Sequence, residues 1–337
     1  MWDTRECKYW KNKLTLDDLI KDKKWHKMSA NSSTSQNIPF EIKRYMKGSE
    51  REVEKTGKVG ILRLKLEKDS ATGNTVIKEQ YSRVPLLAQR VMYLEETLPA
   101  MAYVYIVSPS GGILQGDRYQ IDIKLGNNTF AHVTTQGATR IYKMEKNYAS
   151  QTININVQEE GYFEYIPDQI IPYRNSRFYQ EVNLNVHDNA TMIYSEVIVP
   201  GRVASGEAFE YDICYIKTVG RNQLGKTRFM DVVKLDPKNK NWRTEGILGK
   251  YKVVGTTYIV TGESFVQDLQ HEIGETIKKF EVKNTISGGT SILPARQGII
   301  IRILGNSAED VKKIIFHVVG TARKQIVGAS FSGTRKA

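Results

Sequence analysis

The feature that most constrains the fold is a strict alternation of apolar and polar residues, which recurs along the chain after Lys58. Apolar residues occupy every second position at 62–66, 121–125, 153–157 and 182–186, and polar residues lie between them. A period of two places successive side chains on opposite faces of a β-strand. Since each run has one apolar face, that face must be buried against a second layer. The chain is therefore predicted to be mainly β.

Other runs are apolar at nearly every position, which indicates strands covered on both faces. They lie at 102–107, 191–199 and 251–260. Turn-forming pairs such as Gly126-Asn127 and Asp188-Asn189 recur at strand-length intervals between the runs. With 337 residues the chain can bury a sizeable core. We expect a large stack of strands.

Two segments near the C-terminus have helical periodicity. The first, at about 264–280, carries an apolar stripe. The second, at about 307–327, opens at Ser307, has Glu309 and Asp310 in its first turn, and stops before Gly328. Both stripes need an apolar surface to cover. We therefore expect two C-terminal α-helices packed on the β structure.

Residues 1–57 differ in composition from the rest of the chain. They are rich in lysine, include a polar run at 29–36, and show one short helical pattern at 14–20. This predicts a basic, partly flexible N-terminal extension ahead of a single β domain at 58–337. No secretory leader is evident, and no apolar run approaches the roughly 20 residues of a membrane span. We expect a cytoplasmic protein without membrane association.

The net charge of +12 favours acidic partners. The basic residues alternate with acidic ones along the chain instead of forming a block, which disfavours nucleic acid as the partner. A basic β-module that binds polyanions or carbohydrate remains an alternative.

The chain lacks the usual patterns of catalytic and tight metal sites. The glycine-rich segment at 110–117 has no Lys-Ser/Thr ending and leads into a strand, unlike a phosphate-binding loop. Cys7 and Cys214 are too few for a disulfide framework, and the five histidines have no metal-ligand spacing. No enzyme activity and no tightly bound cofactor are predicted. A hydrolase that uses Glu196 and Asp168 as acid and base is kept as a rival.

Glu196 is the most unusual acidic residue. It shares the strand phase of Met192, Tyr194 and Ile198, so the pattern places a carboxylate in an apolar layer. Such a group must be paired, hydrated or ligating, because burying an isolated charge is costly. Two interpretations stay open: an ion pair with a residue such as Arg202, or a position on a wet internal passage.

Three further acids fit a passage of this kind. Asp117 follows the glycine-rich turn, whereas Glu164 and Asp168 lie among aromatic and proline residues. Carboxylates hold first-row transition-metal ions weakly compared with histidine or cysteine, which suits transient passage better than storage.

A set of short motifs, ordered along the chain, carries a resemblance to a known family. They are Ser110-Gly111-Gly112, Gly116-Asp117, Thr134-Thr135-Gln136, Thr139-Arg140 and Tyr142-Lys143. Their order resembles that of the urease accessory proteins UreD, called UreH in some organisms. The segments 165–173 and 196–207 extend the similarity, which covers most of the chain after about Lys58.

The resemblance implies a β-helix-like stack of strands with two late helices. It also implies a scaffold that binds apo-urease subunits, recruits UreF and, through UreF, the GTPase UreG, and forms a homodimer within that complex. Ni²⁺ would pass to the urease active site through an internal polar tunnel. By motif position this role falls on Glu196 and Asp117. Glu164 and Asp168 follow less directly, because Asp168-Gln169 reverses the order that many family members have.

Overall fold

The computed structural model describes residues 38–46, 57–281 and 285–333. The chain divides into two compact units, Met1–Arg44 and Tyr45–Ala337. In the first unit, the described part contains the one-turn helix α2 (Phe40–Lys43), in which Ile42 is buried. The predicted properties of residues 1–57 fall mostly outside the described residues. All that follows concerns the second unit.

In the part of the chain that the structure describes, one sheet has seven strands. We call it sheet A, and its order is β14-β13-β11-β8-β5-β1-β2. Its strands are β1 (Val59–Lys68), β2 (Thr75–Arg83), β5 (Arg118–Leu125), β8 (Ala149–Val157), β11 (Arg177–Val186), β13 (Ile213–Arg221) and β14 (Thr227–Leu235).

The second sheet, sheet B, has ten strands among the described residues. Its main path is β16-β17-β15-β12-β9-β6-β4-β3, and β7 and β10 pair beside this path. Its strands are β3 (Leu87–Ala88), β4 (Ala102–Val107), β6 (Phe130–Thr135), β7 (Thr139–Ile141), β9 (Tyr162–Tyr165), β10 (Ile170–Pro172), β12 (Thr191–Ile198), β15 (Val253–Val260), β16 (Ile286–Ile292) and β17 (Gly298–Gly305).

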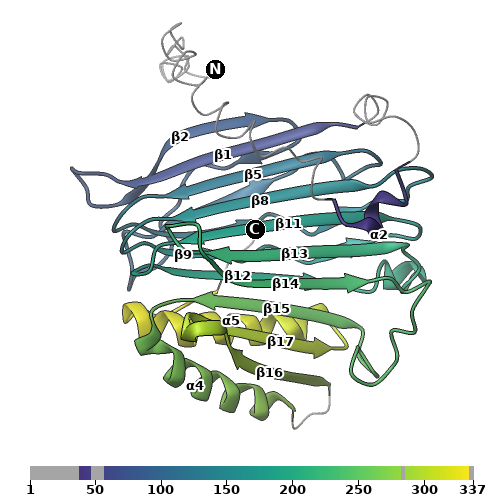
Figure 1. Ribbon diagram of the computed structural model, residues 1–337. Helices are drawn as coiled ribbons and strands as arrows, with labels where there is room; N and C mark the ends of the chain where they lie inside the picture. The colour runs from purple at the N-terminus through teal and green to yellow at the C-terminus, as the bar shows by residue number, and fades with distance from the viewer. Residues whose placement is uncertain (1–37, 47–56, 282–284, 334–337) are drawn as a thin grey trace, which may run out of the picture. The chain divides into compact units, whose positions relative to one another are not determined.

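The chain passes back and forth between the two sheets, and each passage lies next to the one before it. From β4 to β13 the long strands belong alternately to sheet B and sheet A, and neighbours within each sheet pair in parallel. Each coil therefore adds one strand to both sheets (Figure 1). This is the β-helix-like stack that the resemblance implied, and the mainly β prediction is confirmed.

The alternating runs place their apolar residues between the sheets. Register aligns Leu62, Ile121, Ile153 and Val182 on neighbouring strands of sheet A, and all four are buried. The polar residues between them point away from sheet B. There, Asn154 donates a hydrogen bond to Asp122 at 2.7 Å. The inner apolar row therefore continues from strand to strand, with polar residues on the opposite face.

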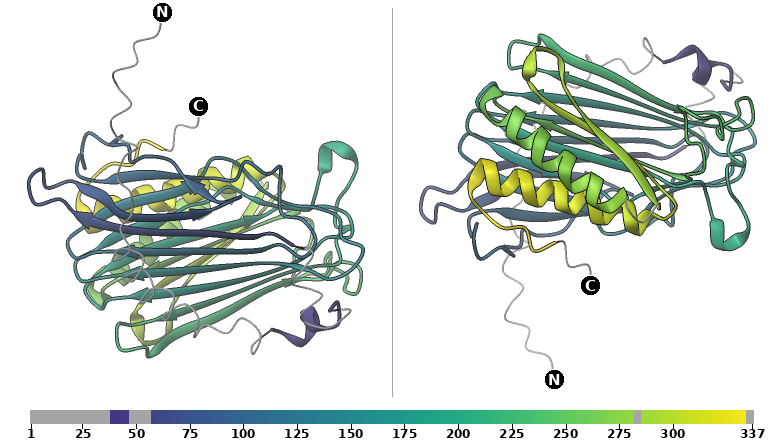
Figure 2. Two further views of the ribbon diagram at one scale, coloured as in Figure 1. Left: turned by 90° about the horizontal axis from the view of Figure 1, so that it is seen from above. Right: turned by 90° about the horizontal axis from the view of Figure 1, so that it is seen from below.

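The helices α4 (Glu263–Glu281) and α5 (Ala308–Val327) cover the other face of sheet B (Figure 2). Both predicted helices are confirmed. At the start of α5, the Ser307 hydroxyl accepts a hydrogen bond from the Asp310 N–H, and Gly328 ends the helix in the left-handed conformation. With sheet A on one side and the helices on the other, strands β12 and β15 are buried throughout, as their apolar patterns predicted.

Close packing of α5 depends on glycine in the strands below it. A Cβ atom at Gly255 would lie 2.5 Å from Val311 Cγ1, and one at Gly305 would lie 2.7 Å from Val311 Cγ2. Both distances are too short for a real contact. Within the described residues, no helix is both long enough and apolar enough to cross a bilayer.

Candidate functional site

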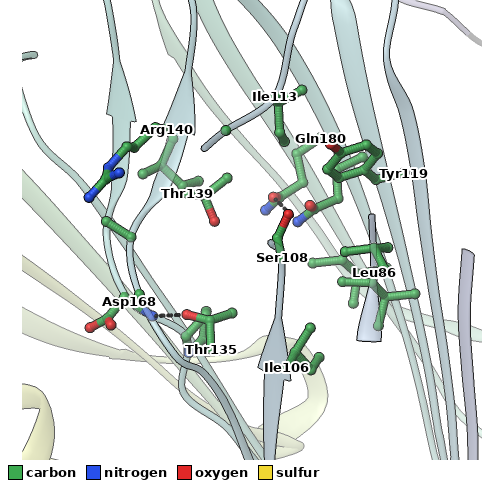
Figure 3. Close-up of a pocket in the computed structure, with 18 of the residues that line it drawn as sticks. Leu86, Ile106, Ser108, Ile113, Tyr119, Thr135, Thr139, Arg140, Asp168 and Gln180 are labelled. Atoms are coloured by element: carbon green, nitrogen blue, oxygen red, sulfur yellow. Dashed lines mark hydrogen bonds between the residues drawn. The ribbon is translucent and has the colours of Figure 1, made fainter. Parts of the chain in front are cut away.

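A cavity of about 260 Å³ lies between the two sheets (Figure 3). Its rim includes the exposed residues Ser108, Gly111, Gln136 and Arg140. Its inner wall comes from both sheets and is formed by buried residues, which include Gln151 and Gln180 of sheet A and Tyr194 and Glu196 of sheet B. The cavity thus leads from exposed loops to a buried carboxylate.

The glycine-rich turn at the rim is shaped by close backbone contacts. A Cβ atom at Gly112 would lie 2.5 Å from the carbonyl oxygen of Arg140, so only glycine lets the turn approach β7. Gly116 has a φ of 81°, which also favours glycine. The sequence signal of three glycines therefore marks a real constraint on the mouth of the cavity.

Asp117 follows this turn but does not contribute to the cavity wall. Its carboxylate accepts hydrogen bonds from the backbone N–H groups of Lys58 and Leu114, at 2.8 and 2.9 Å. The Tyr119 hydroxyl donates a third, at 3.3 Å. Asp117 is buried, and these bonds fix the turn to the first strand of sheet A.

Glu196 lies at the inner end of the cavity, with 2% of its surface exposed. The Tyr194 hydroxyl donates a hydrogen bond to Oε2 at 3.0 Å, and Oε1 has no hydrogen-bond partner among the described residues. Burial raises the pKa of Glu196 to about 7, although the bond from Tyr194 opposes this shift. Glu196 therefore changes charge near neutral pH.

A chain of hydrogen bonds runs from sheet A to this carboxylate. The Gln151 amide donates to the Gln180 oxygen at 3.1 Å, and the Gln180 amide donates to the Tyr194 hydroxyl at 3.1 Å. Both glutamines occupy inward-facing positions of alternating strands, on β8 and β11. Sequence reasoning missed them, although a polar residue in the apolar phase of a strand was the signal that could have found them.

The alternative that Arg202 neutralises Glu196 is wrong. Arg202 pairs with Glu207 instead, with Nη2 to Oε1 at 2.5 Å and Nε to Oε2 at 2.9 Å, and its guanidinium lies over the ring of Tyr173. The two residues are five apart in sequence, so a local loop satisfies the arginine. Across the described residues no ion pair of Glu196 is found within 4.0 Å.

Asp168 contributes to the cavity wall near its rim. Its backbone N–H donates to the Thr135 hydroxyl at 2.9 Å, as Figure 3 shows. Its carboxylate forms an ion pair with Lys312 of α5. Asp168 is therefore a wall residue whose charge is already partly neutralised.

Glu164 lies on the opposite face of sheet B, under α5, and is not part of the cavity wall. Its Oε2 contacts Arg323 Nη2 at 2.6 Å and His132 Nδ1 at 2.6 Å, and all three side chains are fully buried. Burial alone would raise the pKa of Glu164, but the charge of Arg323 and the hydrogen bond with His132 hold it at about 2. Glu164 is thus a permanently charged partner of the helix.

The donor set of the cavity suits passage of a cation better than its retention. Among the described residues, no group of three or more histidine, cysteine, aspartate or glutamate side chains is arranged to hold a metal ion. The described residues that line the cavity include no histidine or cysteine, so its side-chain metal ligands are carboxylate, amide and hydroxyl oxygens. The hydrolase alternative is disfavoured, because Glu196 is buried and Asp168 is paired with Lys312.

Known proteins resemble this chain over most of its length. A family model described as UreD urease accessory protein matches residues 58–336. Urease accessory protein UreD of Cenarchaeum symbiosum (strain A) is 43% identical over 284 residues, which cover 84% of this chain and 98% of that protein. UreD of Photorhabdus laumondii is 35% identical over 278 residues, 81% of this chain and 84% of that protein.

A third relative, urease accessory protein UreD 2 of Brucella suis, is 37% identical over 276 residues, 81% of this chain and 90% of that protein. The family model covers the whole two-sheet stack and the helices on it. The chain therefore belongs to the UreD family of urease accessory proteins and has a role in urease maturation.

Proposed function

We propose that the chain is a scaffold for urease maturation that also gives Ni²⁺ a protected route to the urease active site. It docks on nickel-free urease in the cytoplasm, holds UreF and, through UreF, the GTPase UreG, with two copies of the chain in the complex. The observation that carries the route is Glu196: a buried carboxylate at the inner end of a cavity, with one oxygen atom that has no partner in the described part of the chain.

The chemistry of this group fits a cation in transit. A buried carboxylate without a fixed cation attracts a passing divalent ion, since the surrounding medium screens charge weakly. Carboxylate and hydroxyl oxygens bind Ni²⁺ less tightly than histidine or cysteine does, so the ion is released again. No resident cofactor is required by this proposal, and Ni²⁺ is the cargo.

The four predicted site residues divide into two groups. Glu196 and Asp168 form parts of the cavity wall, and we assign them to the route. Asp117 holds the turn at the mouth, and Glu164 is engaged by Arg323 outside the cavity. In this proposal the latter two support the structure and do not contact the ion.

The route is tested by Glu196→Leu in cells that express urease and its accessory proteins. The variant should still assemble with urease but should lower the nickel content of purified urease, measured by atomic absorption. Glu210→Gln, which changes an exposed carboxylate paired with Arg174, is the matched control and should leave nickel loading unchanged. Normal nickel loading with Glu196→Leu would refute the route.

The scaffold role has its own test. Purified chain, immobilised through a tag, should retain both apo-urease and UreF from defined mixtures, and should retain UreG only when UreF is present. If neither apo-urease nor UreF is retained, the scaffold proposal fails, whatever the result for nickel.

A further inference from the structure

Glu196, Thr256 and Arg302 form a row across sheet B that runs from the buried carboxylate to the surface. Glu196 on β12 is the register partner of Thr256 on β15, and Thr256 is the register partner of Arg302 on β17. Register partners on adjacent strands point to the same face and lie next to each other. Because Tyr194 and Tyr258 share this phase and belong to the core between the sheets, the row faces sheet A.

Two oxygen atoms in this row lack protein partners. Thr256 is 1% exposed and Glu196 is 2% exposed, and neither Thr256 Oγ1 nor Glu196 Oε1 has a hydrogen-bond partner among the described residues. Buried polar atoms without partners are rare and costly. Two such atoms on paired positions therefore indicate a place that a polar ligand or a cation occupies in the working protein.

The row ends at a second carboxylate. Asp231, on the edge strand β14 of sheet A, accepts hydrogen bonds from the Tyr258 hydroxyl and from Arg302 Nη2. The side chains of Asp231 and Arg302 are 23% and 43% exposed, so this end of the row reaches solvent. The charges of Asp231 and Arg302 both act on the pKa of Glu196, in opposite directions, which agrees with their closeness.

We infer that Glu196, Thr256, Tyr258 and Asp231 form a second, oxygen-lined site for a divalent cation, which continues the route beyond the cavity, and that Arg302 gates its outer end. This inference rests on the proposed function for the identity of the cation as Ni²⁺. Of the four predicted passage residues, Glu196 alone belongs to this second site.

The gate follows from charge. Without a cation, the Arg302 guanidinium neutralises Asp231 and closes the row. A divalent ion that reaches Asp231 repels the guanidinium and replaces it as the partner of the carboxylate. Since Arg302 is nearly half exposed, its side chain can turn into water without losing a buried environment. The ion then lies at Asp231 on β14, beside the partly exposed side chain of Arg302 on β17.

The test is Ni²⁺ binding to the purified, untagged chain by isothermal titration calorimetry. Asp231→Asn should weaken binding by about tenfold, the lower range for loss of a group that supports a metal site. Thr256→Val should weaken binding to a smaller extent while leaving thermal stability equal or higher, because the hydroxyl has no protein partner to lose. Arg302→Gln should tighten binding by a few-fold, since a competing cation is removed.

Arg174→Gln, which removes an exposed arginine that pairs with Glu210, is the matched control and should bind Ni²⁺ as the unchanged chain does. Equal affinities for Asp231→Asn, Thr256→Val, Arg302→Gln and the unchanged chain would overturn the second site. If Glu196→Leu still lowers nickel in urease in that case, the proposed route stands and only its continuation fails. If Glu196→Leu also has no effect, the route itself fails.

Discussion

Two buried carboxylates on neighbouring strands differ in pKa because their side chains point to opposite faces of sheet B. In the parallel pair of β9 and β12, Glu164 aligns with Ile193, so it points to the helix side of sheet B. Glu196, three residues further along β12, points to the sheet A side. The first has a pKa of about 2 beside a buried arginine, and the second, which forms no ion pair with any residue that the structure describes, has a pKa of about 7.

This difference predicts an effect of pH on stability. Because the folded chain holds the Glu196 proton up to about pH 7 and the unfolded chain only to about 4.5, the contribution of Glu196 is fully present below pH 4.5 and is lost as the pH rises through 7. Glu196→Gln removes that loss. Relative to the unchanged chain, the variant should gain roughly 3 kcal/mol in free energy of unfolding between pH 4.5 and 8.

Urea denaturation at several pH values measures this gain. Glu210→Gln again serves as the control, since Glu210 pairs with Arg174 on the surface. A difference between Glu196→Gln and the unchanged chain that stays constant with pH would show that Glu196 is hydrated in the native state.

At the scale of elements, a buried arginine of α5 adds a polar anchor to the apolar packing of the helix on sheet B. Arg323 is fully buried and donates hydrogen bonds to Glu164, Glu95, the Tyr103 hydroxyl and the Ser330 carbonyl oxygen. These partners come from strands, a loop and the segment after the helix. A single side chain thus ties together parts of the chain that are far apart in sequence.

Arg323→Met should destabilise the protein by about 3–5 kcal/mol, because Glu164 and Glu95 would remain buried without the guanidinium that pairs with both. The free energy of unfolding in urea measures the loss. Lys313→Met on the same helix, which removes an exposed pair with Glu309, should change stability little. If both variants lose the same amount, the buried network is not what anchors the helix.

The glycine below α5 gives a second prediction for the same pair of elements. Gly255→Ala should cost about 1–3 kcal/mol, because the new methyl group overlaps Val311 and either the helix or the strand must move. Gly289→Ala on β16, where nothing lies within 4 Å of the added atom, should be neutral or slightly stabilising. Thermal melts of the two variants, recorded by circular dichroism, make the comparison.

At the scale of the whole molecule, the family similarity and the two-sheet stack have nearly the same bounds. The family model begins at residue 58, and β1 begins at Val59. The compact unit that contains the stack begins at Tyr45. A chain that starts at Tyr45 should therefore keep its melting temperature within a few degrees.

A chain that starts at residue 69 is the informative comparison, because it lacks β1, which pairs with both β2 and β5 in the interior of sheet A. It should fail to fold. A large loss of melting temperature in the chain that starts at Tyr45 would mean that the first unit supports the stack.

The amino-acid sequence by itself determined the local features of this protein. The alternating runs fixed which side chains of β5, β8 and β11 are buried, because a period of two leaves no other choice of face. The apolar stripes and the Ser307 cap placed both helices. The order of short motifs indicated the family, and the phase of Glu196 on its strand showed that a carboxylate enters the core.

Only the tertiary structure decided which acidic side chains form ion pairs. Glu164 and Arg323 are 159 residues apart, so no local pattern could pair them. Arg202 pairs with Glu207, five residues away, and Glu196 has no ion pair among the residues that the structure describes. The row from Glu196 through Thr256 to Arg302 exists only through the register of three strands. The register of two strands depends on pairing and packing between segments that are distant in sequence. The sequence of a single strand does not specify these contacts.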